Sequence, residues 1–158
     1  MTLAESSLRG LKILCFLSLL GFIYCMAFDT TKILTYYTLD FDSMVEDSAA
    51  YEMINNELSR WEENEIDVSP KGLRKVALLF LFRAIFDVFA LLGVALMFYR
   101  MKIGFSIYLI SQLAYVLLPL LMLGVNATAV VPLNMMAINL IYVALFITQR
   151  KHLLARDK

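Results

Sequence analysis

Arg83 and Asp87 are two charged residues inside an apolar run, KVALLFLFRAIFDVFALLGVALMFYR (75–100), that is long enough to cross a bilayer. Their i, i+4 spacing places both side chains on one face of a helix, close enough to form a salt bridge. Inserting either charge alone would cost roughly 2.5–3.5 kcal/mol, and pairing recovers part of that cost. We therefore expect Asp87 to pair with Arg83, and the pair to face protein or water rather than lipid.

Two further apolar stretches carry polar side chains that could face this pair. Gln112 and Tyr115 lie in one stretch, and Asn139 and Tyr142 lie in the next. An unpaired amide inside a membrane is costly, so these side chains are expected to meet. The predicted intramembrane polar cluster comprises Arg83, Asp87, Gln112, Tyr115, Asn139 and Tyr142. Such a cluster can fix the register of the helices, form a path for a proton, ion or small polar solute, or contact a transmembrane helix of a partner.

Four apolar stretches must position these residues. They run over residues 11–28, 76–99, 104–125 and 130–148 in a chain of 158 residues that is 61% hydrophobic, with a mean hydropathy of +0.73. At about 1.5 Å rise per residue, a helix of this length can span a hydrocarbon core of roughly 30 Å. The runs are continuous and rich in Leu, Ala and Met, unlike membrane strands. We therefore predict an all-α membrane protein with four transmembrane helices in contact with the lipid bilayer.

The first stretch, 11–28, contains no carboxylate. Its small residues Ser18, Gly21 and Cys25 follow one another at i, i+3 and i+7, which predicts a face that a neighbouring helix can approach closely. We interpret this face as a packing seam.

The basic residues predict the orientation of the chain. They fall in three groups: Arg9 and Lys12; Arg100 and Lys102; and Arg150, Lys151, Arg156 and Lys158. A chain that crosses the membrane four times places all three groups on one side, and an excess of Lys and Arg marks the cytoplasmic side. Both termini, including a tail over residues 149–158, are therefore expected to be cytoplasmic, and residues 29–75 to be extracytoplasmic.

The outer segment, 29–75, is acidic and is expected to contain two elements. Residues 30–42 are rich in Thr, Tyr and Ile, which favours a strand or an extended stretch at the level of the headgroups. Residues 47–65, approximately, have the pattern of an amphipathic helix. Its apolar stripe comprises Tyr51, Ile54, Leu58 and Trp61. The stripe can dock on the outer ends of the spans or on a partner protein.

The residues that catalysis or metal binding needs do not occur in recognisable patterns. His152 is the single histidine and lies in the basic tail. A lone histidine there cannot build a zinc site or ligate a haem inside the bundle. The sequence shows no phosphate-cradling glycine loop, no nucleophile–base pair and no pair of carboxylates within a span. We therefore expect no enzyme activity, no catalytic residue, no metal, no cofactor and no nucleic-acid partner.

The segment YRMKIGFSIYLISQLAYVLLPLLMLG (99–124) combines a basic turn, Gly-Phe, Tyr, Gln and Pro. In this it resembles uncharacterised small four-span proteins of the bacterial inner membrane, and the resemblance extends over residues 76–148. It implies a four-span fold in that membrane, and it implies no activity and no functional residue.

The small size, the lack of a catalytic pattern and the apolar stripe favour a non-catalytic subunit or accessory factor of a larger membrane complex. Its partner would be another membrane protein or further copies of itself. The alternative is a small transporter or channel for an ion, a proton or a small polar solute, which would use the polar cluster.

Overall fold

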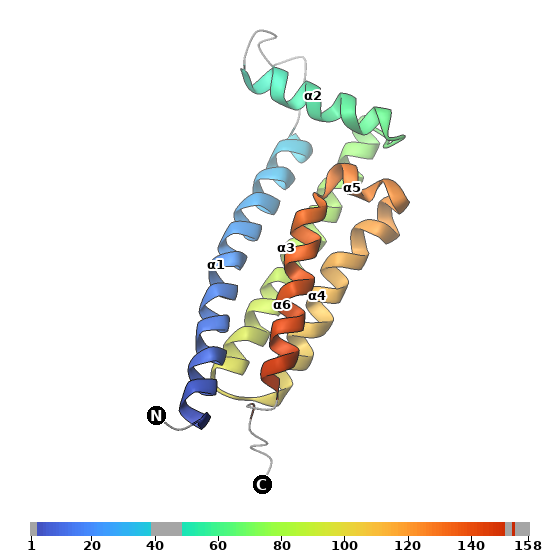
Figure 1. The fold of residues 1–158 in the computed structure, drawn as a ribbon. Helices are drawn as coiled ribbons and strands as arrows, with labels where there is room; N and C mark the ends of the chain where they lie inside the picture. Colours follow the sequence, from blue (N-terminus) through green and yellow to red (C-terminus); the bar gives the residue numbers. More distant parts are fainter. Residues whose placement is uncertain (1–2, 39–48, 151–152, 154–158) are drawn as a thin grey trace.

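The computed structural model describes residues 3–38, 49–150 and 153, and in these residues the fold is all-α (Figure 1). The elements are α1 (Leu3–Thr38), α2 (Ala49–Glu63), α3 (Pro70–Phe98), α4 (Lys102–Leu123), the 3-10 turn η2 (Gly124–Asn126), α5 (Ala127–Val130) and α6 (Leu133–Gln149). Helices α1, α3, α4 and α6 run alongside one another, and α2 crosses the bundle at one end (Figure 1).

Three helical segments are long and apolar enough to cross a membrane: Arg9–Thr38, Pro70–Phe98 and Lys102–Val130. The fourth predicted span corresponds to α6, which is also apolar but has 17 residues. Large apolar side chains such as Phe16, Ile110 and Leu121 are exposed on the bundle surface, as expected of side chains that contact lipid. The prediction of an all-α protein is therefore confirmed for the described residues, and three of its helices could span a membrane.

Helix α1 is longer than the sequence predicts. The first span was expected to end at residue 28, and residues 30–42 were expected to be extended, whereas the helix continues to Thr38. The hydroxyls of Thr31 and Thr38 donate to the carbonyl oxygens one turn back, at 2.8 and 2.6 Å, so the helix satisfies them internally. Packing of Tyr36 in the core overrides the β propensity of this stretch. Residues 39–42 lie outside the part of the chain that the structure describes.

The predicted amphipathic helix is present as α2. Trp61 is completely buried, its ring centroid lies 4.8 Å from that of Tyr36, and its Nε1 donates to the carbonyl oxygen of Ala129 at 3.1 Å. Leu58 is buried in the same cluster, and Lys32 forms a 2.6 Å ion pair with Glu57. Helix α2 is thus fixed to α1, to α3 and to the chain around α5.

The turn between α2 and α3 is fixed by its own hydrogen bonds. The backbone N–H of Ser69 donates to the Asp67 carboxylate at 2.9 Å, and the Ser69 hydroxyl accepts from the N–H of Gly72 at the start of α3. Hydrogen bonds from the side chain and the backbone of Ser69 hold the pKa of Asp67 below its ordinary value. A Cβ at Gly72 would lie 1.9 Å from the carbonyl oxygen of Asp67, so this close approach requires glycine.

The hairpin of α3 and α4 is held by contact between the two backbones. A Cβ built on Gly93 of α3 would lie 2.7 Å from the backbone nitrogen of Tyr108, and one built on Gly104 of α4 would lie 2.6 Å from the carbonyl oxygen of Gly93. Two glycines therefore face each other across the hairpin and set how closely the helices approach.

The start of α1, the α3–α4 turn and the end of α6 lie at one end of the bundle, opposite α2 and α5 (Figure 1). The basic residues Arg9, Lys12, Arg100, Lys102 and Arg150 belong to these three segments, so the structure gathers them at this end. The rest of the basic tail lies outside the described residues, apart from Leu153.

Candidate functional site

Arg83 is the centre of a buried polar group that joins three helices. Its Nη2 lies 3.4 Å from Oδ1 of Asp29 on α1 and donates a hydrogen bond to the hydroxyl of Tyr115 on α4. The guanidinium carbon also lies 4.2 Å from the centroid of the Tyr115 ring and 5.2 Å from that of Phe80. Asp29 and Arg83 are both completely buried, so this ion pair sits wholly inside the protein.

The predicted salt bridge between Arg83 and Asp87 is therefore wrong. No ion pair joins these two side chains, and the carboxylate that faces Arg83 is Asp29. The physical reason is the direction of the side chains on α3. Side chains lean towards the helix N-terminus, so the long Arg83 side chain reaches away from Asp87 and towards the level of Asp29. Sequence reasoning missed Asp29 because it placed the end of the first span at residue 28.

Asp87 and Gln112 form a second polar group next to the first. Their side chains are 3% and 4% exposed, and neither Asp87 Oδ2 nor Gln112 Oε1 has a hydrogen-bond partner within the described part of the chain. Both atoms accept hydrogen bonds, and an acceptor buried without a donor is costly. The two oxygens therefore require a hydrogen-bond donor or a cation.

A cavity of about 380 Å³ lies beside these two acceptors. Helices α1, α3, α4 and α6 all contribute to its wall. Its polar lining residues are Ser18, Cys25, Asp87, Tyr108, Gln112, Asn139 and Tyr142, and the others are apolar apart from Gly21 and Tyr24. Of the six residues predicted to form one cluster, four line this cavity, while Arg83 and Tyr115 belong to the neighbouring group around Asp29.

The cavity reaches the side of the bundle between α1 and α6, where several of its lining residues are exposed. Towards α2, the next turn of α1, α3 and α4 contributes Asp29, Arg83 and Tyr115, which are buried. Towards the other end, the rings of Tyr108 and Phe146 pack edge to face at 4.7 Å between centroids. Exposed apolar side chains of α1 and α6 flank the opening, including Leu17, Leu20 and Ile138. The opening therefore faces the surface that we assign to lipid.

Gly21 borders this cavity instead of forming a packing seam. A Cβ built on Gly21 would meet no heavy atom within 4 Å, so no neighbouring helix approaches it closely. The predicted close-approach face of Ser18, Gly21 and Cys25 is wrong at its central residue, because α1 and α6 are separated there by the cavity.

The four residues of the apolar stripe differ in what they contact. Leu58 and Trp61 are buried against the bundle, and Ile54 packs beside the same cluster. Tyr51 is partly buried. Leu58 and Trp61 therefore pack against the protein's own helices, which is the first of the two alternatives for the stripe.

Replacing Leu58 and Trp61 together by Asp is expected to release α2 without preventing membrane insertion, since two carboxylates cannot remain in an apolar cluster. Limited proteolysis should then cut between residues 49 and 69, which the wild type protects. Met53→Asp is the matched control, because Met53 lies on the same helix and is 72% exposed. Equal protection of the double variant and the control would show that the stripe does not hold α2.

The described residues include no group of three or more His, Cys, Asp or Glu side chains that could hold a metal ion. The two cysteines, Cys15 and Cys25, are free thiols. The polar side chains that line the cavity can accept and donate hydrogen bonds, and the carboxylate of Asp87 can accept a positive charge.

Comparison of the chain with models of protein families, with curated proteins and with solved structures found no match.

Proposed function

We propose that the protein is a non-catalytic, four-span integral membrane protein that acts as a subunit or accessory factor of a larger membrane complex. The lateral cavity receives a hydrogen-bond donor, such as the side chain of Lys, Arg or Asn, from a transmembrane helix of the partner. The observation that carries this proposal is the pair of unpartnered acceptors, Asp87 Oδ2 and Gln112 Oε1, beside a cavity that reaches the side of the bundle.

The shape of the cavity supports a helix as the occupant. A side chain that enters between α1 and α6 comes from within the membrane plane, where a neighbouring transmembrane helix lies. The apolar flanks of the opening would pack against that helix, and its donor would satisfy oxygens that are otherwise buried without partners. A path for solutes would instead need an opening towards each end of the bundle, where the Arg83 group and the Tyr108–Phe146 pair are packed.

We also propose that the protein crosses a bacterial inner membrane four times and that both of its termini lie in the cytoplasm. At about 1.5 Å per residue, a helix of 17 residues reaches the lower limit of lengths that span a membrane. The gathering of basic residues at one end agrees with a cytoplasmic location of that end. Reporter fusions should give cytoplasmic signals at residues 102 and 155 and an extracytoplasmic signal at residue 60.

Asp87→Leu tests the proposed role of the cavity. The change removes a buried carboxylate oxygen that lacks a hydrogen-bond donor. We therefore expect it to raise the free energy of unfolding of the isolated protein in detergent by roughly 1–3 kcal/mol. At the same time, purification in mild detergent should lose the stoichiometric partner that the wild type retains. The control is Leu121→Ala on the exposed face of α4, which should keep the partner. Retention of the partner by a well-folded Asp87→Leu variant would contradict the proposal.

The second candidate function is a small carrier, and the observation that favours it is the same carboxylate beside a cavity of about 380 Å³. A carrier would purify as a homo-oligomer and would move protons or small organic cations across liposome membranes. Asp87→Asn would then abolish transport in a folded protein. If the protein transports such a solute without a bound partner, and transport depends on Asp87, the carrier function is supported and the accessory function is contradicted.

A further inference from the structure

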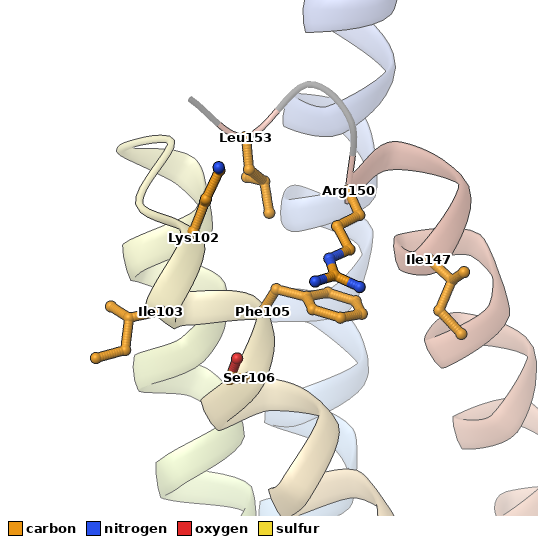
Figure 2. Close-up of a pocket in the computed structure, with 7 residues that line it drawn as sticks. All are labelled: Lys102, Ile103, Phe105, Ser106, Ile147, Arg150 and Leu153. Carbon is orange, nitrogen blue, oxygen red and sulfur yellow. The ribbon is translucent and has the colours of Figure 1, made fainter. Parts of the chain in front are cut away.

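A second cavity lies at the basic end of the bundle, between the start of α4 and the end of α6 (Figure 2). Its volume is about 650 Å³. The lining combines two cationic side chains, Lys102 and Arg150, with the hydroxyl of Ser106 and the apolar side chains of Phe105, Ile147 and Leu153. The cavity thus joins positive charge to an apolar wall, and it is separate from the site at Asp87.

Arg150 is held at the edge of this cavity by an aromatic ring. Its guanidinium carbon lies 5.4 Å from the centroid of the Phe105 ring, and Figure 2 shows the guanidinium group lying next to the ring. Phe105 is itself buried, so the ring has a fixed position. Because the ring contacts the face of the guanidinium, the N–H groups of Arg150 can bind an anion in the guanidinium plane.

The two cationic side chains of the cavity, Lys102 and Arg150, have no acidic partner among the side chains that the structure describes. The sequence contains no Asp or Glu between Asp87 and Asp157, a stretch that includes Arg100 as well as the two lining cations. An anion that reaches the cavity would therefore meet a positive potential.

The apolar part of the lining indicates which kind of molecule bears the anionic group. Ile147 on the cavity wall is 54% exposed at the bundle surface, where we expect lipid chains, whereas Lys102 and Arg150 lie at the end where headgroups are expected. A ligand with an anionic group joined to an acyl chain would satisfy both parts. Basic pockets between transmembrane helices on the cytoplasmic side are suited to such headgroups.

We propose that the cavity lined by Lys102, Ser106 and Arg150 binds a phosphate group, which an anionic phospholipid presents from the cytoplasmic leaflet. Arg150 and Lys102 contact the phosphate oxygens, Ser106 donates a hydrogen bond to one of them, and the acyl chains pass over Ile147. A soluble phosphate is the other source of the same chemistry, and the experiment separates the two.

The test measures ligand binding to the full chain in mild detergent by native mass spectrometry and by thermal melting. The ligands are phosphatidylglycerol, phosphatidylcholine and inorganic phosphate. The test variant is Lys102→Gln with Arg150→Gln, and the control, Arg9→Gln with Lys12→Gln, removes two charges from the same end outside the cavity. Ser106→Trp fills the cavity without changing its charge, and Lys102→Arg with Arg150→Lys keeps the charge.

We expect phosphatidylglycerol to bind and to raise the melting temperature of the wild type, and phosphatidylcholine to bind more weakly. The Gln double variant should lose roughly thirtyfold in affinity for phosphatidylglycerol, since each basic residue near an anionic lipid contributes about 1 kcal/mol. Ser106→Trp should also lose affinity, whereas the control and the charge-conserving variant should keep it. Binding of inorganic phosphate with the same dependence on these residues would support the phosphate site and assign it to a soluble ligand. Equal losses in the Gln double variant and the control would overturn the proposal, because the attraction would then belong to the whole basic end.

Discussion

Arg83→Leu is expected to lower the free energy of unfolding in detergent by about 3–5 kcal/mol, because it leaves the buried carboxylate of Asp29 without its counter-charge. The same change removes the hydrogen bond to Tyr115 and the contacts of the guanidinium with two rings. The matched control is Arg74→Leu, the same substitution about two and a half turns earlier on α3, where the side chain is exposed. That change should alter stability by less than about 0.5 kcal/mol.

The effect of Arg83→Leu should be partly reversed by a second change at Asp29. In Arg83→Leu with Asp29→Leu, neither buried charge remains, so the cost of holding one of them without a partner disappears. Thermal or denaturant melts of the single and double variants measure this directly. If Arg83→Leu melts like Arg74→Leu, the guanidinium does not stabilise the bundle and the buried group around it has no structural role.

Gly93→Ala is expected to destabilise the hairpin of α3 and α4 by about 3 kcal/mol, at the upper end of costs for overpacking. The added Cβ would lie 2.7 Å from the backbone nitrogen of Tyr108 and 2.8 Å from the carbonyl oxygen of Gly104. Both atoms belong to the backbone of α4, so no side chain can move aside, and the two helices must separate. Their separation also loosens the packing of the buried residues on both sides of the contact.

Gly21→Ala is the control for this prediction, because a Cβ at Gly21 would meet no heavy atom within 4 Å. Alanine is favoured over glycine inside a helix by roughly 1 kcal/mol, so this variant should be as stable as the wild type or more stable. The two variants make the same chemical change within membrane helices, and melts in one detergent compare them. Equal melting temperatures would contradict the close backbone contact.

The helices could be predicted from the sequence because continuous apolar runs and the spacing of an apolar stripe report directly on burial. The runs at 76–99 and 104–125 correspond to α3 and α4, and the stripe of α2 to the helix Ala49–Glu63. The end of α1 could not be predicted in this way. Residues 30–38 carry Thr, Tyr and Lys, whose local preferences do not favour a membrane helix, and they are helical because Tyr36 packs against Trp61 of a distant segment.

The candidate site was predictable as a set of residue types but not as a set of pairs. The cost of burying polar groups predicted that Asp87, Gln112, Asn139 and Tyr142 would lie near one another, and all four line one cavity. The partner of Arg83 could not be chosen from spacing along one helix, because the choice depends on how α1 packs against α3. Asp29 would have become a candidate if the first helix had been allowed to continue beyond the apolar run.

The central claim is that Arg83 pairs across helices with Asp29 and leaves Asp87 available to a donor from outside the chain. Two double-mutant cycles in the same detergent test it most directly, one with Arg83→Leu and Asp29→Leu, the other with Arg83→Leu and Asp87→Leu. We predict a coupling energy of about 2–3 kcal/mol between Arg83 and Asp29, and nearly additive effects, within about 0.5 kcal/mol, for Arg83 and Asp87. Strong coupling of Arg83 to Asp87 with additive effects at Asp29 would contradict the account, because Asp87 would then be neutralised within its own helix.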